Sequence, residues 1–404
     1  MSEIEKNDVS EIEREAAEIA AEADATENES SIPHSSTPEK ETKKEPLFHI
    51  SKRDNLSKKH IYGIRAIAIG GSFILMSILI FILAKENPIA ILGCMMEGVF
   101  GKPEFIWRLF SNTAILLGIS LALTPAFKMK FWNCGGEGQV IVASLSSAAC
   151  MLFIGNSVPW FVLLIIMFVT SILSGIIWAL IPAIFKAKWN TNETLFTLMM
   201  NYIAIQLVTF FLKLYGNDQG NLEPMLDFRI PYIFGGPYFL NIVVIAVICA
   251  LMYIYLNYTK HGYEISVVGE SENTAKYIGI SVPKVVIRTL IVSGALCGLI
   301  GFMLSANGSA TVTTTIVSGQ GFTAILVSWL GKFNPIYMIL TSFLVIFLQQ
   351  GTVYMGEIYR LDTAMADVFV GVVLLFIIGC EFFIHYKINF RKKETSKSAK
   401  EEVK

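Results

Sequence analysis

Long apolar runs separated by short polar segments dominate the chain from residue 63 onward. A helix that crosses a membrane needs about 20 mostly apolar residues. Eight runs reach or approach this length: 63–84, 107–127, 160–185, 195–214, 239–257, 286–305, 335–352 and 365–385. Two shorter runs, 138–154 and 321–331, each follow a glycine-rich polar segment. The pattern therefore predicts about ten transmembrane helices.

The two glycine-rich segments lie in opposite halves of the chain. The first is Phe131–Trp132–Asn133–Cys134–Gly135–Gly136–Glu137–Gly138–Gln139, and the second is Ser318–Gly319–Gln320–Gly321–Phe322. Short, glycine-interrupted apolar segments at corresponding positions of two halves are typical of transporters built from inverted repeats. In the expected succession of spans, the runs 138–154 and 321–331 cross in opposite directions. We therefore expect two inverted-topology repeats and a translocation site near the two breaks.

Basic residues near the span ends predict the orientation of the chain. With the N-terminus inside, eighteen Lys and Arg residues flank the spans on the cytoplasmic side and six on the outer side. Because cytoplasmic loops are enriched in Lys and Arg, this asymmetry favours an N-in, C-in topology with an even number of spans.

Composition supports the same class. The chain of 404 residues is 53% hydrophobic and 16% charged, whereas soluble domains are about 25% charged. We therefore expect an all-α polytopic membrane protein with its permease domain over residues 60–390. Residues 1–47 contain 14 acids and five bases and no apolar run typical of a signal peptide. We expect residues 1–50 to be an acidic, mostly disordered cytoplasmic tail with a short helix over 8–22, and residues 391–404 to be a charged cytoplasmic tail.

Chemistry-bearing motifs of enzymes are absent from the sequence. There is no GxxxxGK[ST] segment for binding ATP, no GxSxG nucleophile and no carboxylate pair spaced for acid–base catalysis. The six Cys and five His residues form no CxxC or HExxH pattern. We therefore expect no enzyme activity, no metal site and no cofactor bound by this chain.

Polar side chains within the apolar runs are the candidates for a substrate pathway, because each must find a protein partner or face a cavity. A neutral, hydroxyl-rich ligand could use Asn and Gln amides, and aromatic rings, including that of Trp132, could stack on a base or sugar. Helix packing is the alternative role, and Glu193 could also be a favourable charge at a helix start. The candidates are Asn112, Asn133, Glu137, Gln139, Glu193, Thr197, Asn201, Gln320, Phe322 and Trp329.

A different signal occupies the internal segment 258–285. Ser271 can cap a short helix over 272–278, and Gly279 can end it. A short cytoplasmic helix before a span suits docking onto a partner, and a plain solvated connector is the alternative.

Five motifs in order give the chain a family resemblance over about residues 60–390. It resembles the membrane permeases of ATP-binding-cassette (ABC) importers in the branched-chain amino acid/ribose-type superfamily, most of all nucleoside (guanosine-type) permeases. The motifs are similar to FNIGxEGQ, ExxxTxMMNYIA, GYExxxVGxxxxxAxYxGxxV, SGAxxGLxG and GxGFxxIxVxxLG. The matching segments are Phe131–Gln139, with Trp132 as an extra residue and Cys134 in place of Ile, then Glu193–Ala204, Gly262–Val282, Ser293–Gly301 and Gly319–Gly331.

The resemblance implies a multi-pass permease in the cytoplasmic membrane that works by alternating access. It implies a separate cytoplasmic ATPase subunit that binds ATP-Mg, a second homologous permease subunit, a substrate-binding lipoprotein and contact with membrane lipids, but no nucleic acid. It also implies that the loop 258–285 couples the permease to the ATPase. The residues for this coupling are Gly262, Tyr263, Glu264, Gly269, Glu270, Ala275, Tyr277 and Gly279.

The substrate and the energy source leave alternatives open. The same machinery could import a simple sugar such as ribose or galactose, and Met199–Ala204 favours the nucleoside branch. A stand-alone secondary carrier is less consistent with the sequence, because no acidic residue in mid-span has a basic partner. Dependence of uptake on ATP and on a partner ATPase separates this carrier from the first two alternatives.

Overall fold

The computed structural model describes residues 48–52, 57–84, 87–217, 221–223, 225–230, 232, 236–307, 311–360 and 363–390. The helix expected over 8–22 and the tail 391–404 lie outside these residues. The chain divides into two compact units, one of which is Arg53–His385. The other unit contains the two ends of the chain, Met1–Lys52 and Tyr386–Lys404.

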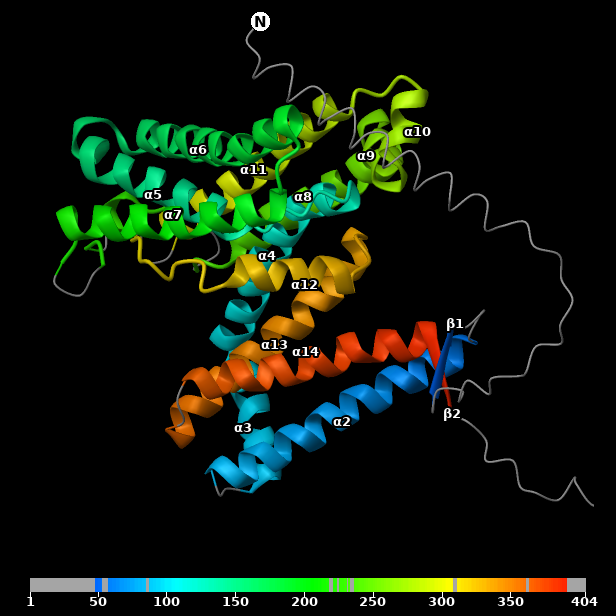
Figure 1. Cartoon of the computed structure of the whole chain (residues 1–404). Helices are drawn as coiled ribbons and strands as arrows, with labels where there is room; N and C mark the ends of the chain where they lie inside the picture. The colour runs from blue at the N-terminus through cyan, green and yellow to red at the C-terminus, as the bar shows by residue number, and fades with distance from the viewer. Residues whose placement is uncertain are drawn as a thin grey trace, which may run out of the picture. The chain divides into compact units, whose positions relative to one another are not determined.

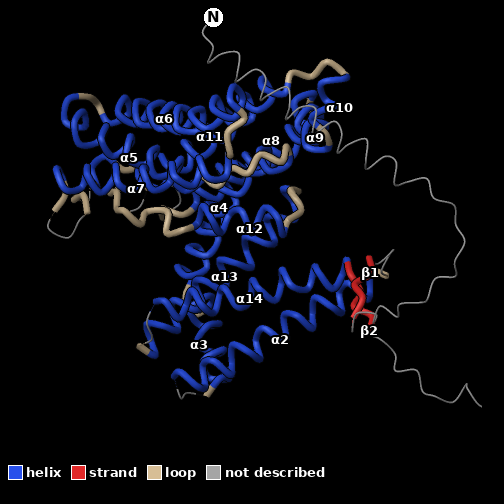
Figure 2. The backbone as a smooth tube through the Cα atoms, viewed as in Figure 1, coloured by secondary structure: helices blue, strands red, loops and turns tan. Residues whose placement is uncertain are grey.

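Helices make up nearly all the regular structure of the larger unit (Figures 1 and 2). They are α2 (Lys58–Ala84), α3 (Pro88–Phe100), α4 (Pro103–Lys128), α5 (Gly136–Ile154), η1 (Gly155–Ser157), α6 (Trp160–Trp189), α7 (Glu193–Tyr215), η2 (Leu226–Phe228), α8 (Phe239–Tyr258), α9 (Lys260–Glu270), α10 (Glu272–Tyr277), α11 (Val282–Ala306), α12 (Gln320–Leu330), α13 (Pro335–Tyr359) and α14 (Thr363–His385).

Seven helices in the described part of the chain are long and apolar enough to cross a membrane. They are α4, α5 extended through η1, α6, α7, α8, α11 and α13. In α2 and α14 the apolar stretches that qualify are shorter, Ala66–Leu79 and Val368–Ile384. The 11 residues of α12 extend about 16 Å, roughly half of a bilayer core. The prediction of a polytopic helical membrane protein is therefore confirmed at this coarser level.

Helix α4 lies at the centre of the larger unit. It packs against α8, α11, α12 and α13. In its most apolar stretch of 18 residues, 89% is buried. In the corresponding stretch of α6 only 22% is buried, and α6 exposes large side chains such as Phe161 and Ile177. An apolar face of that extent would be unfavourable in water and is the surface that a lipid environment requires.

Small residues allow α6 and α11 to approach closely, and the two helices run side by side in Figure 1. A Cβ added to Gly294 on α11 would lie 2.5 Å from the carbonyl oxygen of Gly175 on α6. A Cβ on Gly298 would lie 2.7 Å from Ile172 Cα. Glycine at these positions therefore sets the separation of the two backbones, as small residues commonly do in membrane helix pairs.

Helix α3 lies between the predicted spans 63–84 and 107–127, in a segment for which the sequence predicts no helix. The Asn87 side chain accepts a hydrogen bond from the Ile89 N–H and caps the helix, which begins at Pro88. Met95 and Val99 lie one turn apart and are buried, and α3 packs against α13. Packing of this short apolar stripe, rather than its length, makes the segment helical.

The smaller unit contains two short strands, which an all-α fold does not include. Strand β1 (Phe48–Lys52) pairs antiparallel with β2 (Tyr386–Phe390), and Ile50 lies opposite Ile388. These strands were not predicted from the sequence. The paired segments lie more than 300 residues apart in the chain, since Lys52 lies opposite Tyr386.

Candidate functional site

The structure brings the two glycine-rich breaks together through the carboxylate of Glu137. Glu137 lies in the first turn of α5 and is 6% exposed. Its Oε1 accepts a hydrogen bond from the Gly319 N–H at 2.9 Å, and its Oε2 accepts one from the Gly321 N–H at 2.6 Å. Both donors belong to the turn that starts α12. The carboxylate therefore accepts hydrogen bonds from N–H groups that lack a partner at the start of the helix, where a negative charge is favourable.

Two side chains of α7 hold the backbone of the first break. Asn201 Oδ1 accepts a hydrogen bond from the Gly138 N–H at 2.8 Å, and its Nδ2 donates to the Cys134 carbonyl at 2.8 Å. Thr197 Oγ1 accepts from the Cys134 N–H at 3.1 Å. Both side chains are buried, at 2% and 0% exposed respectively. Their polar groups thus satisfy non-helical backbone inside the protein, as a break within apolar surroundings requires.

The remaining amides of the break also bond within the protein. Asn133 Oδ1 accepts from the Gly135 N–H at 3.0 Å and from Gln139 Nε2 at 3.4 Å. Asn133 Nδ2 donates to Ser293 Oγ on α11 at 3.4 Å. Both amide side chains are buried, at 0% and 1% exposed. The break is thereby connected to α5, α7, α11 and α12.

A polar cavity of about 420 Å³ lies among α3, α4, α13, α14 and the turn before α12. Two of the predicted pathway residues, Asn112 and Gln320, line this cavity. Both are half-buried, so their amides can serve as donors and acceptors toward a ligand. The lining residues are Gly98, Phe105, Arg108, Asn112, Ser318, Gln320, Ile346, Gln349, Gln350, Thr352, Val353, Tyr354, Glu357 and Val370.

Several polar residues that line this cavity are not among the pathway residues predicted from the sequence. Arg108 and Glu357 supply opposite charges, and Gln349 supplies a further amide. Gln350 Nε2 donates to the carbonyls of Gly98 and Phe105 at 3.1 and 2.9 Å. Within the described part of the chain, no donor reaches the buried Gln350 Oε1. The consecutive glutamines in an otherwise apolar run were the signal in the sequence that could have identified this wall.

The other predicted pathway residues lie away from the cavity. Glu193 pairs with Lys186 at 2.9 Å, between the start of α7 and the end of α6. Phe322 and Trp329 lie on α12 and are 45% and 51% exposed. The Trp329 ring centroid is 5.3 Å from that of Trp132. Trp329 therefore packs on Trp132 of the first break, and neither Phe322 nor Trp329 lines the polar cavity.

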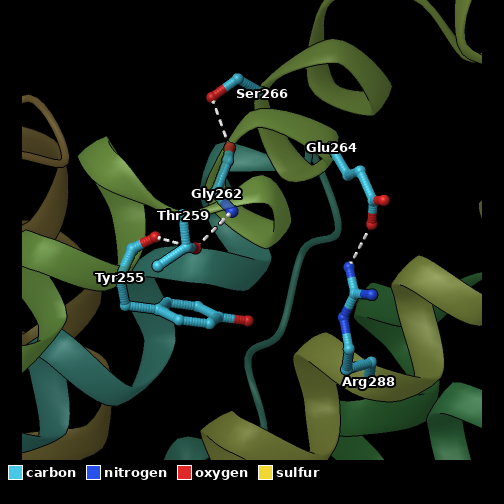
Figure 3. Close-up of polar contacts among 6 residues, drawn as sticks. All are labelled: Tyr255, Thr259, Gly262, Glu264, Ser266 and Arg288. Atoms are coloured by element: carbon cyan, nitrogen blue, oxygen red, sulfur yellow. Dashed lines mark hydrogen bonds and ion pairs between the residues drawn. The ribbon is translucent and has the colours of Figure 1, made fainter.

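The segment 258–285 is mostly helical and contains α9 and α10. Figure 3 shows how α9 begins: Thr259 Oγ1 accepts a hydrogen bond from the Gly262 N–H at 3.2 Å and donates to the Tyr255 carbonyl at 2.6 Å. In the next turn, Ser266 Oγ donates to the Gly262 carbonyl at 3.0 Å. A Cβ on Gly262 would collide with the Tyr255 and Leu256 carbonyls, so the bend between α8 and α9 requires glycine there.

An ion pair fixes α9 against α11 (Figure 3). Arg288 Nη2 on α11 donates to Glu264 Oε2 at 2.6 Å. The side chains are 31% and 14% exposed, respectively. The hydrogen bond from Arg288 holds the pKa of the Glu264 carboxyl below its usual value. The orientation of α9 is therefore set by a charge-assisted contact as well as by packing.

Helix α10 follows the prediction made from its sequence. Ser271 Oγ accepts a hydrogen bond from the Thr274 N–H at 3.3 Å, and Gly279 has a φ of +82° just after the helix. Ala275 is fully buried, whereas Tyr277 is 95% exposed. The short helix is thus anchored by one side chain and presents a large aromatic ring outward.

The rest of the predicted coupling residues divide into packed and exposed positions. Gly269 is buried beside the end of α4, where a Cβ would collide with the Lys128 carbonyl. Tyr263 is 62% exposed, and Glu270 is also exposed. Glycine therefore allows α9 to pack on the protein while its other side remains open. Among the described residues, no group of His, Cys, Asp and Glu could hold a metal ion.

Known proteins resemble this chain along most of its length. The family model for the "Branched-chain amino acid transport system / permease component" matches residues 105–378. The guanosine ABC transporter permease protein NupP of Bacillus subtilis is 25% identical, over 75% of this chain and 88% of its own length. The glucose ABC transporter permease protein TsgB13 of Haloferax volcanii is 26% identical, over 80% and 87%. The nucleoside ABC transporter permease protein NupB of Lactococcus lactis subsp. cremoris is 26% identical, over 79% and 92%. The chain therefore belongs to the permease components of the branched-chain amino acid transport family, and it is a multi-pass membrane transport subunit of the ABC type rather than an enzyme.

Proposed function

We propose that this chain imports nucleosides as the permease subunit of an ABC importer. The observation that carries the substrate class is the polar cavity, in which the amides of Asn112, Gln320 and Gln349 accompany the aromatic rings of Phe105 and Tyr354. A nucleoside has a flat ring with donor and acceptor edges and a sugar with hydroxyl groups, so it can use both kinds of group. Names of similar proteins, including NupP and NupB, support the same class.

In this proposal the membrane body has ten crossings in two inverted repeats, with both ends of the chain in the cytoplasm. The 11 residues of α12 cross together with the irregular segments on either side of them. Irregular backbone at membrane depth is stable only where protein covers it or where it lines a water-filled cavity. The exposed rings of Phe322 and Trp329 on α12 therefore face the pathway and the second, homologous permease rather than lipid.

The amides and hydroxyls around the first break have a supporting role in this proposal. Hydrogen bonds within the protein stabilise the backbone of the break, and they come from Asn133, Gln139, Thr197 and Asn201. Glu193, paired with Lys186, fixes the entry of α7. These residues shape the pathway, while Asn112 and Gln320 contact the substrate.

Alternating access is driven from outside this chain. A cytoplasmic ATPase subunit binds ATP-Mg and docks on α9 and α10 through their exposed side, which includes Tyr263, Glu270 and Tyr277. A substrate-binding lipoprotein delivers the nucleoside at the outer face. In the proposed topology the cavity lies in the outer half of the membrane, because the N-terminal half of α4 and the C-terminal half of α13 line it.

A simple sugar is the second candidate substrate, since the similar TsgB13 is named a glucose permease and the cavity amides could also bind sugar hydroxyls. The test is uptake of labelled guanosine, uridine and ribose by cells with and without this gene, with the partner subunits intact. We expect loss of nucleoside uptake alone. Loss of ribose uptake alone would reject the nucleoside assignment, and uptake that survives inactivation of the partner ATPase would reject the ABC mechanism.

A further inference from the structure

We propose that Glu137 is a positioning residue for the substrate cavity, which it serves without touching the ligand. It does not line the cavity, whereas Ser318 and Gln320 do. Its two carboxylate oxygens accept hydrogen bonds from the peptide N–H groups on either side of Gln320, those of Gly319 and Gly321. The main chain that carries the Gln320 amide is therefore held from both sides by one side chain of the other repeat.

The turn needs such a partner because its backbone is unfavourable by itself. Ser318 has a φ of +50° and Gly319 a φ of +73°, and a residue with a side chain rarely adopts the first of these. The Ser318 hydroxyl donates only to the Thr315 carbonyl within the same turn. The N–H groups of Gly319 and Gly321 both bond to the carboxylate of Glu137, whereas the Gln320 N–H between them bonds to the Val317 carbonyl at 3.0 Å.

Close packing limits the positions that the turn can take. A Cβ on Gly321 would lie 2.5 Å from the Glu137 nitrogen and 2.7 Å from its Cα. The start of α12 therefore rests directly on the start of α5. Among the described residues, no Lys, Arg or His forms an ion pair with Glu137. Loss of the carboxylate would consequently leave two N–H groups near the cavity wall without their acceptor, and Gln320 would move.

This inference rests on the proposed function, in which Gln320 contacts the substrate. The experiment uses the complete transporter in cells and measures the ratio of kcat/KM for labelled guanosine and uridine supplied in competition. The ratio does not depend on how much transporter reaches the membrane. The variants are Glu137→Gln, which keeps one acceptor and the shape of the side chain, Gln320→Ala, and the two combined. Ser328→Ala is the matched control, because Ser328 bonds α12 to the Ser120 carbonyl and does not line the cavity.

We expect Glu137→Gln and Gln320→Ala each to change the ratio about tenfold, which corresponds to about 1.4 kcal/mol. The double variant should match Gln320→Ala alone, because Glu137 acts through Gln320. Ser328→Ala should slow both substrates equally and leave the ratio unchanged. A merely structural role for Glu137 would instead give a wild-type ratio in Glu137→Gln, or effects that multiply in the double variant, and either result would overturn the inference.

Two further outcomes are informative. If Glu137→Gln yields no transporter, Glu137→Asp takes its place. It retains the charge but is too short to reach both N–H groups, and we expect the ratio to shift in the same direction as in Gln320→Ala, by less than tenfold. A wild-type ratio in that variant, too, overturns the inference. If the wild-type transporter carries neither nucleoside, the proposed substrate class fails, and the same variants are compared with ribose and glucose, which tests positioning independently of the nucleoside assignment.

Discussion

Removal of the ion pair between Glu264 and Arg288 should loosen α9 and weaken the coupling of ATP hydrolysis to transport. The two side chains meet at 2.6 Å and are 14% and 31% exposed. Exposed ion pairs contribute about 0–1 kcal/mol, whereas removing one partner of a buried pair costs about 3–5 kcal/mol. The pair in this protein is between these limits, and a hydrogen bond to a charged group contributes about 1.5–3 kcal/mol. We therefore expect an interaction free energy of about 2 kcal/mol.

A double-mutant cycle measures this interaction directly. It compares the wild-type protein with Glu264→Gln, Arg288→Gln and the double variant, with the free energy of unfolding determined by denaturant titration in detergent. Because Gln keeps the size of the glutamate side chain and one acceptor oxygen, the cycle isolates the charge of the pair from packing. The same variants in the assembled transporter should hydrolyse more ATP for each substrate imported, since α9 is proposed to carry the ATPase contact.

Two results would refute this reasoning. An interaction free energy below about 0.3 kcal/mol would mean that the pair is screened as a fully exposed pair is. A full interaction energy with an unchanged ratio of ATP hydrolysed to substrate imported would mean that the orientation of α9 does not control coupling.

Three further predictions follow from the same structure. Since the folded-state pKa of Glu264 is depressed, its stabilisation is complete above the unfolded pKa of about 4.3 and is lost as the pH falls through the folded pKa; the difference in Tm between wild type and Glu264→Gln should therefore vanish in strong acid. Gly298→Ala should destabilise the protein by about 1–3 kcal/mol, because its Cβ would collide with α6, whereas Gly371→Ala, with open space around it, should be neutral or slightly stabilising in the same thermal assay. Asn201→Ala should cost about 1–3 kcal/mol in denaturant titration, because the Gly138 N–H loses its buried acceptor.

Local features of the fold could be predicted from the sequence. The cap at Ser271 and the glycine at Gly279 define α10 through interactions within one turn. The long helices could also be predicted, because the length and composition of the apolar runs are enough to identify them. Helix α3 could not be found in this way, because it is short and becomes stable only when Met95 and Val99 pack on the rest of the protein.

The candidate site was only partly predictable. Polarity within an apolar run selected both Asn112, which lines the cavity, and Asn201, which bonds to the first break. The criterion cannot separate these roles, since each residue only needs a polar partner and the identity of that partner depends on tertiary structure. Arg108 and Glu357 were missed because they lie near helix ends, where charged residues are common. They become neighbours of one cavity only when α4 and α13 pack together.

Helix α11 connects α9 to the first glycine-rich break through polar contacts. Arg288 near its start pairs with Glu264 of α9, and Ser293, just over one turn further on, accepts a hydrogen bond from Asn133 of the first break. Four residues after Asn133, Glu137 holds the turn that carries Gln320. The close crossing with α6 leaves little room for α11 to bend or slide independently. In the proposed mechanism, a displacement of α9 would reach the first break through α11, because Asn133 of that break donates a hydrogen bond to Ser293 of α11.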